Sequence, residues 1–224
     1  MKLGRLNNLL FYFLIYGFLI FIFFIFCWSA VLSQALSAQV TAQHYTIQPE
    51  QELQLLIKVL KFERTLKSRA GDIFAIGVVN QKSYSLSSWT AADWLALNQK
   101  ISAQQIKIEG LPIVIIEIDS DLPLPVLEDK LKQESVDFIY FPPLEVKTGP
   151  TIIKKICRLA EKLKIGTFTD LPEYLDYGVA IAFSFQENKL QIILNLPAAR
   201  SQGLDFSANF LHLVNLRKGH DANH

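Results

Sequence analysis

The sequence predicts a single α/β domain with a mostly parallel central sheet, flanked by helices and closed by a C-terminal antiparallel hairpin and helix. Three observations predict this class. Short apolar runs such as 72–80 and 136–141 are typical of strands buried on both faces of a sheet. Segments with apolar residues at helical spacing separate these runs, as in βαβ units. Two alternating strands then follow each other directly within 178–196, which indicates a hairpin.

The first helix of the domain is expected from about Pro49 to Lys67. Proline suits the first helical turn, leucines recur on one face, and Gly71 provides a stop. The elements expected after it are, in chain order, a strand at 72–80, a helix at 87–100, an edge strand at 104–110, a strand at 111–118, a helix at 123–135, a strand at 136–141, a helix at 148–166, a strand at 166–170 and the hairpin at 178–196.

The segment after the hairpin has the residues of a tight helical turn. Asn195 can cap a short helix at 198–200, and Pro197 suits its first turn. Gly203 is expected to end that helix with a positive φ. A second helix is then expected to start near Ser207, with leucines that seal the core.

The N-terminus reads as an export signal. Lys2 and Arg5 precede a long apolar run at 9–32, and small polar residues follow it. Residues 1–38 are therefore expected to be either a cleaved signal peptide or a retained membrane anchor, because the run is long enough to span a bilayer. A lipoprotein signal around Cys27 is a third reading. All three readings place the rest of the chain in the periplasm or otherwise outside the cytoplasm.

The domain boundaries follow from this signal. Residues 39–49 are polar and are expected to form a linker, residues 50–217 the folded domain, and residues 218–224 a polar tail. Beyond the signal the chain keeps one cysteine, Cys157, which excludes an internal disulfide. Cys157 flanks the apolar stripe of a predicted helix, so the reading of a packed thiol is favoured over that of a reactive one.

The sequence offers no catalytic, metal or cofactor motif. It has no P-loop, no Gly-x-Gly-x-x-Gly, no Gly-x-Ser-x-Gly and no histidine pair at ligand spacing. The formal net charge of +1 gives no field that would attract nucleic acid. The acids of 117–121 could hold a cation at a strand end, but an acidic loop facing solvent is the favoured reading. These absences predict a binding protein without a cofactor, and not an enzyme.

Basic residues supply the candidate contacts for a ligand or partner. Arg64 and Lys67 are three residues apart, so on a continuous helix they would occupy neighbouring sites of one face. There they could meet a phosphate or a carboxylate, although a solvated basic face is the simpler explanation. Arg200, in the C-terminal turn, is the third candidate.

The segment "QIILNLPAARSQGLDFSANFLHLVNL" resembles the closing signature of the YfiR/HmsC-like family of exported regulatory proteins. In that signature a strand ends in Asn-Leu, and a small-residue turn with Arg, a Gly and a Leu-rich helix follow. "LLIKVLKFERTLKSRAGDIFAIGVV" and "VDFIYFPPLE" are similar to the opening and middle of the family. Asn195, Arg200 and Gly203 match the closing motif, where their favoured role is to build the turn.

The resemblance implies a non-enzymatic function in the periplasm. The best-known members bind the sensing domain of an inner-membrane diguanylate cyclase and hold it inactive, which lowers cyclic di-GMP and restrains biofilm formation. The partner expected here is such a cyclase or a histidine kinase, with membrane contact only through the N-terminal segment. The alternative is a periplasmic small-ligand binding accessory of a transporter or outer-membrane receptor. Since Cys157 has no partner cysteine, the resemblance does not extend to members that bear disulfides.

We predict that residues 39–224 fold without metal or reductant, because this region has no ligand cluster and no second cysteine. A chelator and dithiothreitol should each leave the melting temperature unchanged in a circular dichroism melt. A fall of more than a few degrees with either reagent would contradict the prediction.

Overall fold

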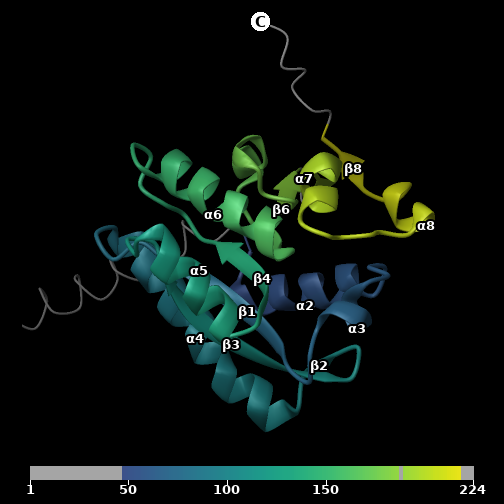
Figure 1. Ribbon diagram of the computed structural model, residues 1–224. Helices are drawn as coiled ribbons and strands as arrows, with labels where there is room; N and C mark the ends of the chain where they lie inside the picture. Colours follow the sequence, from purple (N-terminus) through teal and green to yellow (C-terminus); the bar gives the residue numbers. More distant parts are fainter. Residues whose placement is uncertain (1–46, 187–188, 218–224) are drawn as a thin grey trace, which may run out of the picture. The chain divides into compact units, whose positions relative to one another are not determined.

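A computed structural model of the chain describes residues 47–186 and 189–217 (Figure 1). They belong to a compact unit, Ile47–His224, that is separate from Met1–Thr46. The expected signal or anchor at 1–38, most of the linker, the turn of the hairpin at 187–188 and the tail at 218–224 lie outside the described residues. Ile47 is only 2% exposed, so the described domain begins ahead of residue 50.

An eight-stranded sheet lies at the centre of the described domain, in the order β2-β3-β1-β4-β5-β6-β7-β8. The strands are β1 (Phe74–Asn80), β2 (Lys107–Ile108), β3 (Leu111–Asp119), β4 (Val136–Phe141), β5 (Gly166–Thr169), β6 (Ile181–Gln186), β7 (Lys189–Leu194) and β8 (Asn215–Leu216). Strands β3, β1, β4, β5 and β6 are parallel, and β6 and β7 form the antiparallel hairpin. The predicted α/β class with a mostly parallel sheet is confirmed.

Helices cover both faces of this sheet (Figure 1). Their bounds are α2 (Pro49–Leu60), α3 (Leu66–Arg69), α4 (Ser85–Gln104), α5 (Leu124–Gln133), α6 (Gly149–Leu163), the 3₁₀ helix η1 (Pro172–Tyr177), α7 (Leu196–Ser201) and α8 (Ala208–Leu211). Helices α2, α4, α7 and α8 pack into one hydrophobic core. Helices α5 and α6 and the η1 helix, which the sequence did not predict, pack into the other.

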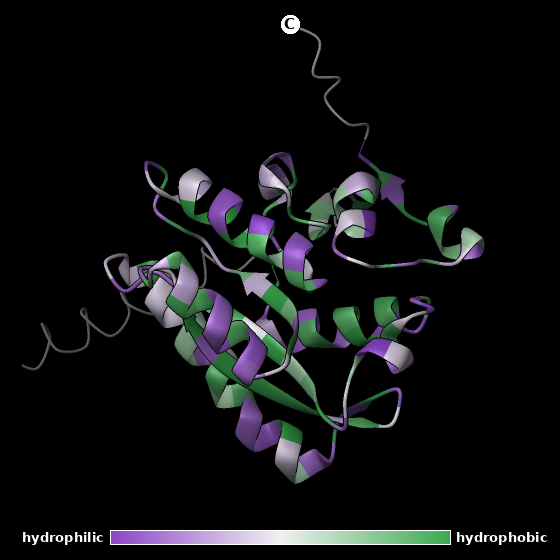
Figure 2. Cartoon of the chain, viewed as in Figure 1, coloured by the Kyte–Doolittle hydropathy of each residue, from purple (hydrophilic) through white to green (hydrophobic). Residues whose placement is uncertain are grey.

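The alternation of side chains along the strands separates the two cores. In β4, Phe138 and Tyr140 point into the core under α2 and α4, whereas Ile139 and Phe141 point into the core under α5 and α6. Figure 2 shows strands that are apolar along most of their length, beside helices with one apolar and one polar side. This pattern is expected of a sheet covered on both faces.

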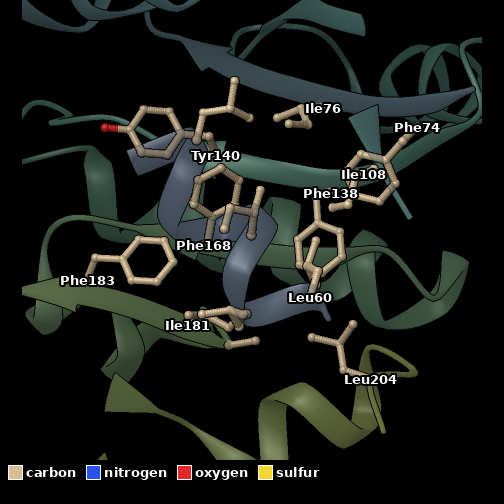
Figure 3. Close-up of a cluster of buried hydrophobic side chains, with 14 of the residues drawn as sticks. Leu60, Phe74, Ile76, Ile108, Phe138, Tyr140, Phe168, Ile181, Phe183 and Leu204 are labelled. Atoms are coloured by element: carbon tan, nitrogen blue, oxygen red, sulfur yellow. The ribbon is translucent and has the colours of Figure 1, made fainter. Parts of the chain in front are cut away.

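Aromatic rings fill the core under α2 and α4 (Figure 3). Phe138, Tyr140, Phe168 and Phe183 come from three neighbouring strands, and Trp94 of α4 packs against Tyr140 and Phe168. The ring centroids of Trp94 and Tyr140 are 4.5 Å apart, and those of Tyr140 and Phe168 are 5.1 Å apart. Rings of this size bury a large apolar area, so they are a main source of the stability of the sheet.

A bulge interrupts the pairing of the two central strands. Ala75 of β1 pairs with Val136 of β4, but the next residue, Ile76, pairs with Phe138. Asp137 is thus the extra residue, and its carboxylate accepts a hydrogen bond of 2.9 Å from the backbone N–H of Ala75. The side chain therefore replaces the ladder bond that the bulge removes.

The expected first helix to Lys67 was wrong, because α2 ends at Leu60. Beyond it the backbone pairs with the C-terminal segment instead of continuing the helix. Arg64 donates its N–H to the Asp205 carbonyl at 2.9 Å, and Glu63 forms an antiparallel bridge with Phe206. These tertiary bonds outweigh the helical propensity of the segment, so Arg64 and Lys67 do not share a helix.

The closing helix is present but much shorter than expected. It is the four-residue α8, and the chain then extends into β8, which pairs with the outer edge of β7. Phe206 and Phe210 fill the core here, whereas Leu213 and Leu216 are 75% and 46% exposed. Leu211 packs partly buried against the core, whereas Leu216 lies in β8, which pairs with the edge of β7. The expected seal by leucines is therefore correct only for Leu211.

The turn around Gly203 has the geometry that the sequence predicts. Asn195 accepts a hydrogen bond from the N–H of Ala198, and Pro197 lies in the first turn of α7. Gly203 has a φ of 82°. Its N–H and that of Leu204 donate to the carbonyls of Arg200 and Ala199, at 3.0 and 2.9 Å. This is the Schellman arrangement, in which the positive φ favours glycine.

Gly203→Val should destabilise the protein by at least about 1–2 kcal/mol, because a β-branched residue is strained at positive φ. Its Cβ would also lie 3.2 Å from the Cβ of Lys164. His212→Ala removes an exposed side chain and should change stability by less than about 0.5 kcal/mol. Urea denaturation of both variants tests this, and equal unfolding free energies would contradict it.

Candidate functional site

In open α/β sheets, ligands bind at the carboxyl ends of strands where the chain order reverses. Here that point lies between β1 and β4, because β1 leads through α4 to β3 on one side and β4 leads through α6 to β5 on the other. The polar side chains at this edge bond to one another. Asn80 donates to Glu117 at 2.9 Å and accepts from Ser88 at 2.9 Å. Gln81 donates to Thr148, also at 2.9 Å. These groups are therefore held by neighbours within the domain.

The acidic segment at this edge is engaged in the same way. Asp119 pairs with Lys82 at 2.7 Å, and Glu117 accepts the Asn80 bond. In the described ranges, no group of three or more His, Cys, Asp or Glu side chains is arranged to hold a metal ion. Glu117 and Asp119 thus form contacts within the domain, so the reading of a loop that faces solvent describes only Asp121, which is exposed.

Two carboxyl groups lie buried together in the core under α2 and α4. Glu52, in the first turn of α2, is 1% exposed, and Asp170, just after β5, is 4% exposed. The hydroxyl of Tyr140 donates to Asp170 at 3.3 Å. Within the described residues, neither carboxylate oxygen of Glu52 makes a hydrogen bond of good geometry. The nearby hydroxyl of Tyr140 nevertheless lowers the pKa of Glu52 to some extent. We call Glu52, Tyr140 and Asp170 the acid cluster.

Burial dominates the ionisation of the acid cluster. It raises the pKa of Glu52 well above 4.5, and the negative charge of Asp170 adds to that rise. Burial also raises the pKa of Asp170 to about 6. The sequence analysis did not predict this cluster, although the spacing of Glu52 from the buried leucines of its helix indicates it. Glu52 is four residues before Leu56 and eight before Leu60, so it occupies the apolar stripe of its helix.

A second buried network joins the N-terminal and C-terminal segments. Glu63 is 6% exposed. Its carboxylate accepts hydrogen bonds from the N–H of Thr65, the hydroxyl of Thr65 and the N–H of Asp205. These bonds are 3.0, 2.6 and 2.9 Å long. The hydroxyl of Thr65 also lies 3.2 Å from the carbonyl of Gly203. Three donors on one carboxylate fix the chain between α2 and α3 against the C-terminal turn.

Arg69 extends this network into the core. Its guanidinium donates to the carbonyls of Lys164 and Gln202, at 2.9 and 3.3 Å, and lies over the ring of Phe138 at 5.8 Å. Burial lowers the pKa of Arg69, while the charges of Glu63 and Asp137 oppose that change. Arg69 thereby connects α3, the end of α6 and the end of α7.

The three candidate contact residues lie on the segments that this network holds. Arg64 pairs with Asp205 at 2.9 Å, and its side chain is 62% exposed. Lys67 pairs with Glu109 at 3.2 Å and is 70% exposed, while Arg200 lies exposed on α7. Beside Arg64, Phe62 is 41% exposed and stacks on Phe210 with centroids 5.2 Å apart. We call Phe62, Arg64, Lys67 and Arg200 the corner surface.

Cys157 is 2% exposed and packs beside the backbone of Gly178, where an added Cβ would lie 3.2 Å from the Cys157 Cβ. Burial raises the pKa of the thiol, and the charge of Glu161 adds to the rise. A buried thiol with a raised pKa is unreactive, which supports the packed reading.

Among the described residues, no helix is both long enough and apolar enough to cross a membrane.

The comparison with solved structures finds chains that are similar to this one at low sequence identity. A conserved domain protein from Vibrio cholerae O1 biovar eltor matches with a TM-score of 0.50 and 16% identity over 76% of this chain and 60% of its own. A substrate binding protein with adhesive properties from Clostridium difficile matches with a TM-score of 0.48 and 14% identity, over 72% of this chain and 59% of its own. The chain thus spans about three fifths of the solved chains it matches. No curated protein matches it by sequence.

The family is shown by sequence. Residues 54–215 match the YfiR/HmsC-like family, and the chain belongs to that family. The match includes α2 from its second turn onward, every strand from β1 to β7, and the turn at Gly203. Membership supports a periplasmic regulatory role, a statement that holds for the family as a whole.

Glu63→Ala should lower the free energy of unfolding by about 2–4 kcal/mol, because it leaves three donors without their buried acceptor. Asp205→Ala removes only an exposed ion pair and keeps the backbone N–H, so it should cost less than about 1 kcal/mol. Chemical denaturation of the two variants measures this difference. A Glu63→Ala variant as stable as Asp205→Ala would show that the network does not hold the two segments together.

Proposed function

We propose that this protein is an exported regulator that binds the periplasmic sensing domain of an inner-membrane signalling protein and holds it inactive, with a diguanylate cyclase as the partner. The observation that carries the proposal is the match of residues 54–215 to the YfiR/HmsC-like family. The basic and apolar N-terminal sequence at 1–38 supports export. The engaged polar groups at the strand ends agree with a protein that acts by binding and not by catalysis.

Regulation across a membrane requires a partner with two conformations. A domain outside the cytoplasm changes a cytoplasmic output only by binding one conformation of a spanning protein more tightly than the other. A differential affinity of roughly 1–3 kcal/mol changes the balance of the two conformations by about 5- to 150-fold. No catalytic group is needed for this function.

The corner surface is the part of the domain best suited to such a partner. It presents a partly exposed aromatic ring, Phe62, and, two residues later, the exposed guanidinium of Arg64. Aromatic residues and arginine are enriched at protein interfaces. Its backbone is held by Glu63 and Arg69, so little conformational freedom is lost on binding. Its basic residues favour an acidic patch on the sensing domain.

Deletion of the gene should raise cyclic di-GMP, and the full-length protein should restore the original level. A variant without residues 1–38 should fail to restore it, because it would lack the export signal and stay in the wrong compartment. Cyclic di-GMP is measured in the four strains by mass spectrometry. Restoration by the variant without the signal would refute the proposal, and unchanged cyclic di-GMP on deletion would refute a cyclase partner.

The same assay tests the corner surface. Arg200→Glu reverses a charge at that surface, and Lys58→Glu makes the same change at an exposed position of α2, outside it. Arg200→Glu should complement the deletion poorly, whereas Lys58→Glu should complement it fully. Equal complementation by the two variants, at equal protein levels, would exclude Arg200 from the interface.

A further inference from the structure

The acid cluster has no role in the proposed binding surface, and its composition is unusual for a core. Its groups come from three elements: Glu52 from α2, Tyr140 from β4 and Asp170 just after β5. The charge of Glu173, in η1, acts on Asp170 from outside the cluster. Trp94 of α4 packs against the ring of Tyr140. In the part of the chain that the structure describes, no Lys or Arg bonds to Glu52 or Asp170. The cluster therefore holds two carboxyl groups without a counter-ion.

A buried carboxylate without a counter-ion is strongly unfavourable, whereas a protonated carboxyl group is neutral. Ionised Glu52 would face Asp170 across the hydroxyl of Tyr140, and both acids would then be negative in a closed core. Glu52 regains water only if the first turn of α2 leaves the sheet. Its ionisation state is therefore tied to the position of this helix.

We propose that Glu52 and Asp170 form a proton-operated latch that holds α2 on the sheet, closed when Glu52 carries a proton and weakened when it does not. Four apolar side chains of the helix, Leu53, Leu56, Val59 and Leu60, are buried with Glu52. Their burial keeps the helix docked for most of the time at every pH at which the protein is folded. Loss of the proton raises the fraction of time for which α2 is open, without unfolding the rest of the domain.

The direction of the pH effect follows from burial. In open α2, Glu52 lies in water and ionises near its ordinary value of 4.5, whereas in closed α2 it keeps its proton to a higher pH. Between these two values, opening releases one proton. The opening constant then increases by up to roughly tenfold for each unit of pH. The latch is thus strongest in acid and weakens towards neutrality, while Asp170, which ionises near pH 6, adds a second negative charge.

The latch would regulate the proposed partner contact. Helix α2 leads directly into Phe62, Arg64 and Lys67 of the corner surface, so opening of α2 loosens that surface. Only this consequence rests on the proposed function. The latch itself is tested on the purified protein, without a partner.

Hydrogen exchange of the full chain, held in a mild non-ionic detergent, measures the latch at pH 5.5 and pH 7.5. Protection factors, corrected for the intrinsic effect of pH, are compared for α2 and α6. Helix α6 lies on the other face of the sheet and serves as the internal reference. Protection of α2 should fall at least tenfold between the two pH values, with a smaller change in α6.

Two neutral variants identify the titrating group. Glu52→Gln mimics the protonated acid, so the pH dependence of α2 protection should be lost. Glu50→Gln is the matched control. Glu50 lies in the same turn of α2 as Glu52, but its side chain is 46% exposed and pairs with Lys100 of α4, so the pH dependence should remain. Constant protection of α2 in the wild type, an equal fall in α2 and α6, or an unchanged fall in Glu52→Gln would each overturn the latch. Failure of the cyclic di-GMP experiment would leave these results unaffected.

Discussion

The carboxylate of Glu63 joins the start of the domain to its end. It receives hydrogen bonds from Thr65, two residues away, and from Asp205, 142 residues away. These bonds turn the chain out of α2, and the opposed segments then form the bridge between Glu63 and Phe206. Because strands β1 to β7 lie between these segments in the sequence, one buried carboxylate joins the chain before these strands to the chain after them. The position of Gly203, Arg69 and the corner surface depends on this closure.

Three buried acids of this protein differ in their environment and so in their effect. Glu63 accepts three hydrogen bonds and Asp137 accepts the backbone N–H released by a bulge, and both stabilise the backbone around them. Glu52 has no comparable donors, and burial raises its pKa. A carboxyl group of this last kind makes local stability depend on pH. Glu63, which fixes the fold, and Glu52, which is proposed to loosen α2, thus lie near the two ends of one segment, α2 and its following turn.

The candidate site could be predicted only in part. Arg64, Lys67 and Arg200 were proposed as contacts because basic residues stand out in a chain with few motifs, and that role stays a prediction. The expected arrangement of Arg64 and Lys67 was wrong. The expected helix placed Arg64 and Lys67 on one face, whereas the backbone of Arg64 pairs with that of Asp205. Glu52 was overlooked because an acid in a first helical turn is the usual complement of the helix dipole. The position of Glu52 on the apolar stripe of the helix was the better indication that its side chain is buried.

The sequence by itself determined the α/β class, the turn at Gly203 and the family. Buried strands, helical periodicity and a glycine at a helix end are local patterns, set by the chemistry of neighbouring residues. Only the tertiary structure decided where α2 stops, that the chain ends in β8, and which acids face each other. These features depend on bonds between residues far apart in the chain, such as Arg64 with Asp205 and Tyr140 with Asp170. Local propensity is worth a few tenths of a kcal/mol per residue, so a few such bonds are enough to override it.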